Sequence, residues 1–113
     1  MEPDINLTQS DPSYPAQPDP PYPAQLLVKG ANAMMQRAVL RDAQDTGERS
    51  MLKTVNIFNA YKGAPVLSEE DGWIFMVFLK LVRGSQGQYH EDDYVDGAAY
   101  VALLGECSRD NRV

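Results

Sequence analysis

Four charged residues near the middle of the chain have types and a spacing that suit chemistry on a phosphate group. Lys80 and Arg83 are three residues apart in an otherwise apolar run, and Asp93 and Asp96 repeat that spacing in the next segment. Residues three apart lie on one face of a helix. Cations of this kind bind phosphate oxygens, and carboxylates hold Mg²⁺. The opposite charges fit either a metal–phosphate site or a structural ion pair, with Asp96 as the partner of Lys80 or Arg83.

The other acids of this region have a structural explanation. Glu69, Glu70 and Asp71 are consecutive and follow Ser68, which is a candidate helix N-cap. An acid three residues after a Ser cap can complete a capping box, and the helix dipole favours negative charge in a first turn. We therefore expect these acids to begin a helix rather than to bind metal. For His90, the single histidine, we expect a capping position before the next helix.

The hydrophobic pattern predicts four helices, which would position the charged residues. We expect them over residues 26–44, 48–61, 68–83 and 91–106. The third helix is apolar on every side between Trp73 and Val82 except at Lys80, so it is predicted to be central and buried. The short glycine-containing turn at 84–88 predicts that the third and fourth helices are antiparallel neighbours. The expected fold is an all-α, small four-helix bundle.

Residues 1–25 form a separate, proline-spaced segment. Seven of the eight prolines lie in the first 23 residues, and Tyr-Pro-Ala-Gln occurs twice, at 14–17 and 22–25. Proline fixes φ and removes a donor, so an extended polyproline conformation is predicted. The segment is either a disordered leader or an arm whose Tyr14 and Tyr22 dock into grooves of the same or a neighbouring subunit. The predicted division is an acidic tail at 1–25, a helical domain at 26–107 and a C-terminal tail at 108–113.

Composition excludes several function classes. The 113 residues carry a net charge of −6, and residues 1–25 contain four acids and no Lys or Arg. The rest of the chain is therefore only weakly acidic, which argues against broad nucleic-acid binding. The single cysteine, Cys107, excludes an intramolecular disulfide and a cysteine-based zinc site. The acidic start is unlike a secretory signal, and no apolar run reaches the roughly 18 residues that span a bilayer.

The small size of the domain also predicts association. About 88 residues remain to fold outside the tail, and domains of this size bury a modest fraction of their surface. A wholly apolar third helix would then be covered by another subunit. We expect a soluble intracellular protein that forms a homo-oligomer, a dimer or larger.

Several stretches of the chain carry a resemblance to a known family. They are Phe58-Asn59-Ala60-Tyr61-x-Gly63, Leu67-Ser68-x-Glu70-Asp71, Leu79-Lys80-x-x-Arg83 and Asp92-Asp93-x-x-Asp96-x-x-x-Tyr100-x-Ala102-Leu103. Over about residues 33–106 the chain resembles DUF6378, a family of small bacteriophage and prophage proteins of uncharacterised function. The Lys-x-x-Arg and Asp-x-x-Asp pieces are similar, more remotely, to the all-α nucleoside triphosphate pyrophosphohydrolases of the MazG and dUTPase type. That superfamily holds Mg²⁺ within a four-helix bundle by two acidic motifs.

Together, the two resemblances imply a phage-encoded, MazG-like nucleotide-handling protein in the cytoplasm of the infected bacterial host. It would bind nucleotides or hydrolyse nucleoside triphosphates weakly with Mg²⁺. The implied roles are metal binding by Asp93 and Asp96, phosphate binding by Lys80 and Arg83, and base stacking by Trp73 or Tyr100. The Glu-x-x-Glu motif of that superfamily is absent here, which leaves enzyme activity open.

The alternative function is a non-enzymatic one. The chain would be a phage interaction protein that inhibits or redirects a host or defence factor. In that case the helices form a scaffold, and the tail with Tyr14 and Tyr22 makes the contacts. Nucleotide binding separates the two hypotheses, because only the first requires it.

Overall fold

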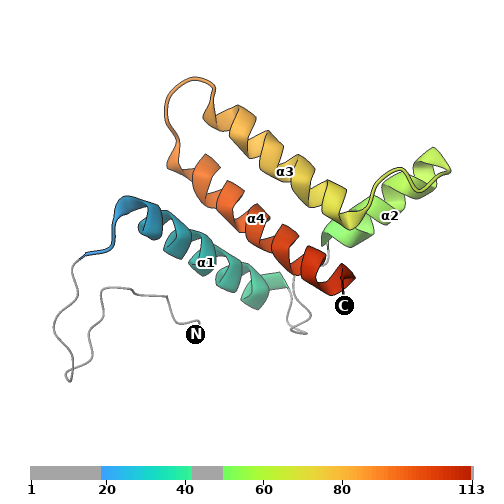
Figure 1. Cartoon of the computed structure of the whole chain (residues 1–113), viewed down its shortest axis with the longest axis horizontal. Helices are drawn as coiled ribbons and strands as arrows, with labels where there is room; N and C mark the ends of the chain where they lie inside the picture. Colours follow the sequence, from blue (N-terminus) through green and yellow to red (C-terminus); the bar gives the residue numbers. More distant parts are fainter. Residues whose placement is uncertain (1–18, 42–49, 113) are drawn as a thin grey trace.

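Four α-helices make up the described part of the chain (Figure 1). The computed structural model describes residues 19–41 and 50–112. The helices are α1 (Tyr22–Arg41), α2 (Ser50–Lys62), α3 (Glu69–Gly84) and α4 (Glu91–Asn111). No β-strand occurs within these residues. The predicted all-α fold, a small helical bundle, is confirmed.

The first helix begins earlier than the sequence predicts. We expected an extended chain through residue 25, and for residues 22–25 this was wrong, because α1 begins at Tyr22. Pro23 lies in the first turn, where a helix has no partner for the backbone N–H that proline lacks. The Gln25 backbone N–H donates to the Pro21 carbonyl at 3.1 Å, and its side-chain amide donates to the Pro20 carbonyl at 2.9 Å. Tyr14 and the predicted start of the second helix at residue 48 lie outside the described residues.

Helix α4, not α3, is the central helix. Figure 1 shows α4 between α1 and α3, with α2 against the first part of α3. The prediction that the third helix is buried on all sides was therefore wrong. Only one side of α3 contacts α4, and on the opposite side Phe75 is 68% exposed and Phe78 is 60% exposed. The antiparallel pairing of α3 and α4 is as predicted.

Two glycines allow the outer helices to approach closely. A Cβ at Gly30 of α1 would lie 3.3 Å from the Val95 carbonyl oxygen of α4. A Cβ at Gly72 of α3 would collide with the Met51 side chain of α2 and lie 3.2 Å from Val55 Cγ2. A larger residue would therefore press on the α4 backbone at position 30 and on side chains of α2 at position 72. Val55 is itself buried in this contact.

The predicted start of α3 is confirmed in detail. Ser68 Oγ accepts from the Asp71 backbone N–H at 3.1 Å, and Asp71 Oδ2 accepts from the Ser68 N–H at 3.0 Å. This is a capping box. Glu70 instead accepts from Ser108 Oγ at 2.5 Å and from the Asn111 amide at 3.3 Å. These contacts join α3 to the last turns of α4, which ends five residues beyond its predicted end at 106.

The first turn of α1 is held by a polar cluster around the start of α4. Tyr22 donates to Glu91 Oε2 at 2.9 Å and lies 2.6 Å from the Tyr89 hydroxyl. Lys29 Nζ donates to Glu91 Oε1 at 2.6 Å. The Lys29 ammonium and then the Tyr22 hydroxyl hold the pKa of Glu91 below its usual 4.5. Within residues 19–41 and 50–112, no helix is both long and apolar enough to cross a membrane.

Candidate functional site

The structure brings Lys80 and Asp96 together across α3 and α4. Lys80 Nζ lies 2.9 Å from Asp96 Oδ2. The Lys80 side chain is 13% exposed and that of Asp96 27%. Gly97, next to Asp96, would place a Cβ 3.6 Å from Lys80 Cβ, so the two helices meet closely here. One predicted phosphate-binding cation is thus paired with one predicted metal ligand.

The other two residues of the predicted metal–phosphate site stand apart from this ion pair. Arg83 is exposed in the last turn of α3, and Asp93 is half-buried in the first turn of α4. Within the described residues, neither side chain forms an ion pair. No group of three or more His, Cys, Asp and Glu in this part of the chain could hold a metal ion. The roles of Arg83 and Asp93 stay predictions.

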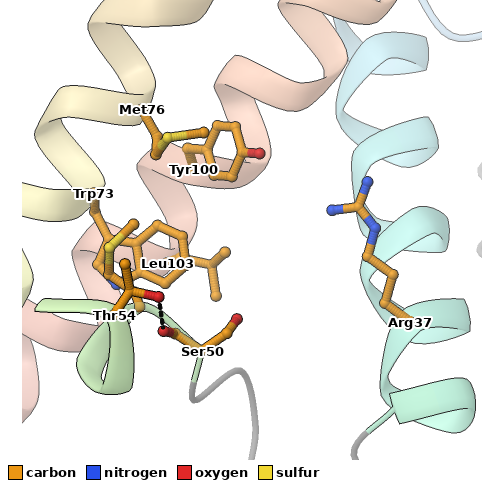
Figure 2. Close-up of a pocket in the computed structure, with 8 residues that line it drawn as sticks. Arg37, Ser50, Thr54, Trp73, Met76, Tyr100 and Leu103 are labelled. Carbon is orange, nitrogen blue, oxygen red and sulfur yellow. Dashed lines mark hydrogen bonds between the residues drawn. The ribbon is translucent and has the colours of Figure 1, made fainter. Parts of the chain in front are cut away.

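Figure 2 shows the lining of a cavity, whose volume is about 330 Å³. The cavity lies one helical turn from the ion pair. Its walls include Met76 of α3 and Tyr100 of α4. Lys80 follows Met76 by four residues and Asp96 precedes Tyr100 by four, so the charged pair occupies the next turn of both helices. The ion pair and the cavity are therefore neighbours along the contact between α3 and α4.

The two residues predicted to stack a base meet at this cavity. Trp73 and Tyr100 both line it, with ring centroids 5.9 Å apart and ring planes inclined by 31°. Trp73 is 4% exposed, and its indole Nε1 donates to Glu69 Oε2 at 3.4 Å. Leu103 of α4 adds to the apolar wall. The wall is therefore aromatic and largely fixed in place by packing.

Polar groups reach the cavity from two further helices. Figure 2 shows the guanidinium of Arg37 extending from α1 toward the cavity, opposite Ser50 and Thr54 of α2. Thr54 Oγ1 donates to the Ser50 carbonyl at 2.7 Å. Within the described residues, Arg37 forms no ion pair. An apolar cavity with one cation and a few hydroxyl groups can bind a flat ring that carries an anionic group.

Sequence reasoning missed Arg37 for an identifiable reason. Helical spacing alone places Arg37 on the polar side of the first helix, where a cation is expected to face solvent. Its approach to Tyr100 and Trp73 depends on how α1 lies against α4. That packing depends on Gly30, and a single glycine within a helix does not indicate which helix it meets. No local signal in the sequence would have identified Arg37.

Of the two tyrosines predicted to dock, only Tyr22 lies within the described residues. Tyr22 contacts Tyr89 and Glu91 of its own chain. The hydrogen bond with Tyr89, followed by desolvation and by the Glu91 carboxylate, raises the pKa of Tyr22 well above its usual value. This is a contact within one chain, and docking on another protein stays a prediction. Tyr14 lies outside the described residues.

The residues that build the cavity fall within a recognised family. Residues 33–108 match a domain of unknown function, DUF6378. The chain belongs to the DUF6378 family. The match includes the ion pair and every cavity residue named above, from Arg37 to Leu103, and it leaves out Tyr22 and Lys29. The resemblance stated from the sequence is confirmed at this level.

A phage protein is among the relatives of this DUF6378 chain. The gene 55 protein of Mycobacterium phage L5 is 33% identical over 63 residues, which cover 56% of this chain and 38% of that protein. The chain therefore spans well under half the length of this relative. No solved structure matches. These findings support a phage protein of unknown function, and they do not bear on the MazG resemblance.

Proposed function

We propose that this DUF6378 chain is a nucleotide-binding protein. The base would occupy the cavity between α3 and α4. The observation that carries the proposal is that Trp73 and Tyr100, chosen from the sequence as base-stacking residues, line one cavity together. Base–aromatic stacking contributes about 1–3 kcal/mol per base and tolerates different bases.

The size and lining of the cavity support a ligand of this class. Its volume of about 330 Å³ is at the small end of the range typical of ligand pockets. Such pockets are lined mainly by apolar and aromatic groups, with a few polar groups that orient the ligand. Trp73, Met76 and Leu103 supply the first kind of lining, and Arg37 and Thr54 the second. A nucleobase with its sugar at the cavity mouth fits this combination.

Arg37 is the best-placed cation for the first phosphate. A guanidinium binds phosphate through two parallel hydrogen bonds, and Arg37 has no ion-pair partner among the described residues. Lys80 is already paired with Asp96, so it would meet a phosphate only by sharing or leaving that carboxylate. Lys80 and Arg83 therefore become candidates for the more distant phosphates.

The proposal also gives Mg²⁺ a role beside the nucleotide phosphates. Asp93 and Asp96 would hold the ion, since Mg²⁺ in nucleotide sites takes one or two carboxylates together with ligand phosphates and water. Oδ2 of Asp96 contacts Lys80, and Oδ1 has no ion-pair partner within residues 19–41 and 50–112. When bound, the ion would neutralise phosphate charge. Weak pyrophosphohydrolysis, in the cytoplasm of an infected host, would follow only if phosphate-bound Mg²⁺ completes this donor set.

The single tryptophan of the chain provides the test. Because Trp73 lines the cavity, its fluorescence should change saturably when ATP, dATP, GTP or dUTP is added, with and without Mg²⁺. Ligand at 100 times its Kd should also stabilise the fold by about 2.7 kcal/mol. Arg37→Gln should weaken binding at least about tenfold, whereas the control Arg109→Gln on the exposed end of α4 should not. No fluorescence change and no stabilisation with any of the four nucleotides would refute the proposal.

The same titration addresses the alternative function. A non-enzymatic interaction protein that inhibits or redirects a host or defence factor needs no response to nucleotides. One observation favours it, namely the exposed apolar side of α3 around Phe75 and Phe78. Nucleotide binding in the cavity would not by itself explain why the apolar side of α3 is exposed.

A further inference from the structure

The outer side of α3 carries a continuous apolar stripe. Five residues at helical spacing are exposed along it, namely Ile74, Phe75, Phe78, Leu81 and Val82. The helix contacts its neighbours elsewhere, with Gly72 facing α2 and Lys80 facing α4. Val77 and Leu79, which flank the stripe, are half-buried and also apolar. From Gly72 to Val82, therefore, no charged side chain lies on this side of α3.

The stripe is symmetric about Phe78. Its members lie four and three residues before Phe78 and three and four residues after it. If a second α3 lies antiparallel with Phe78 against Phe78, Ile74 meets Leu81 of the other copy and Phe75 meets Val82, because each pair lies on the same edge of the stripe. Every apolar side chain then has an apolar partner on the other copy. Such self-matching is what a two-fold interface requires, because each surface must complement itself. The spacing of the stripe therefore permits a two-fold pairing of two copies.

The exposed area is also of the size that a dimer uses. Five apolar side chains that are between 36% and 68% exposed leave on the order of 500 Å² per chain. Each partner in a standard interface buries about 800 Å² in total, with the apolar part at its centre and a polar rim around it. The stripe can supply most of the apolar centre. It is comparable to the largest apolar patches on soluble monomers, about 300–600 Å², which often serve a function.

We propose that a second copy of this chain covers the stripe, with the two α3 helices packed antiparallel about a two-fold axis at Phe78. The spacing of three and four residues is the one that packs helices side by side at a shallow crossing angle. The cavity lies on the α4 side of α3, away from the stripe, so both copies keep it. This dimer is independent of nucleotide binding, and either proposal can fail alone.

The position of Phe78 on the axis allows a sharp test by charge exchange. Phe78→Glu places two carboxylates against each other, and Phe78→Arg places two guanidinium groups there. Each variant alone should dimerise at least about a hundredfold more weakly than the wild type, because opposed like charges cost several kcal/mol. An equimolar mixture of the two should recover a dimer, because only the mixed pair places opposite charges on the axis. The measurement is sedimentation equilibrium against the 12.6 kDa of one chain.

Cross-linking checks the register, and a matched substitution checks specificity. Phe78→Cys should form an intermolecular disulfide across the axis under mild oxidation. Phe75→Cys should do so efficiently only when mixed with Val82→Cys, which lies on the same edge of the stripe. Leu27→Glu replaces a residue of α1 that is as exposed as Phe78, at 62%, and should leave the dimer intact. Circular dichroism establishes that each variant remains helical.

Three results would overturn this proposal. One is a wild-type chain that stays monomeric at tens of micromolar, which would assign the stripe to a different protein. Another is a dimer that Phe78→Glu does not weaken, which would place the interface elsewhere. The third is a mixture of Phe78→Glu and Phe78→Arg that stays monomeric while each variant is folded. That result would exclude an axis at this residue.

Discussion

The ion pair between Lys80 and Asp96 offers a quantitative test of how this site is built. Asp96→Asn leaves the ammonium of Lys80, which is only 13% exposed, without its counter-charge. Lys80→Met leaves Asp96, which is 27% exposed and better able to reach water. Breaking a fully buried pair by removing one partner costs about 3–5 kcal/mol. Because both side chains here keep some solvent contact, we expect about 2–3 kcal/mol for Asp96→Asn and about 1–2 kcal/mol for Lys80→Met.

The double variant isolates the free energy of interaction between Lys80 and Asp96 from the other contacts of each side chain. Methionine packs in place of the lysine stem and asparagine in place of the carboxylate, so neither charge remains to be desolvated. We expect the double variant to lose less stability than the two single losses combined, with a coupling free energy of about 1–2 kcal/mol. The assay is urea unfolding followed by Trp73 fluorescence and by circular dichroism. All four proteins should be compared at one concentration, because association with a second copy would add to the apparent stability.

Two outcomes of the cycle would refute the reasoning. Strict additivity of the two substitutions would mean that the 2.9 Å contact contributes nothing specific to the fold. A stabilised Asp96→Asn would mean that the carboxylate is strained by its site rather than satisfied by Lys80, which is the behaviour of a group held in place for a ligand.

Three further predictions concern packing and titration. Gly72→Ala should lower the free energy of unfolding by about 1 kcal/mol or more, because the new methyl group collides with side chains of α2. Gly105→Ala places its methyl group where no atom lies within 4 Å, so it should raise the free energy of unfolding by up to about 1 kcal/mol. Thermal unfolding measures both changes. The pKa of Glu91 is lowered mainly by Lys29, so its contact stabilises the fold above pH about 4.5 and is lost as the pH falls through the lower folded value. Wild-type stability in urea should therefore fall more steeply below that pH than that of Glu91→Gln, and equal slopes would contradict the contact. Burial raises the pKa of the Cys107 thiol to about 11, so iodoacetamide at pH 8 should modify it more than about tenfold faster in the unfolded protein than in the folded one.

The helices could be predicted from the sequence because their signals are local. The Ser68–Asp71 capping box and the helical spacing of apolar residues each depend on neighbours within one or two turns. The pairing of Lys80 with Asp96 was also foreseeable, since a short turn places α3 and α4 side by side and a largely buried ammonium needs a partner. These inferences required only the order of the helices and the preferences of single residues.

The order of the helices in space could not be predicted in the same way. An all-apolar α3 indicated a central helix, but the smaller residues of α4, among them Ala99 and Gly97, allow close approach from both sides and give α4 that position. The apolar excess of α3 is then left exposed at Phe75 and Phe78. The cavity depends on the same arrangement, since it needs α1 to bring Arg37 across to Tyr100. Long-range packing, unlike capping, leaves no fixed spacing in the sequence.

The most direct test of nucleotide binding in the cavity is an NMR titration of the isotopically labelled full chain with dATP and Mg²⁺. The indole Nε1–H of Trp73 gives a single signal, because the chain has one tryptophan. We predict saturable shifts of that signal and of the backbone amides of Arg37, Thr54 and Tyr100, with amides along the outer side of α3 unchanged. Shifts that are absent from these residues at saturating nucleotide, or that cluster around Phe78 instead, would contradict the proposed site.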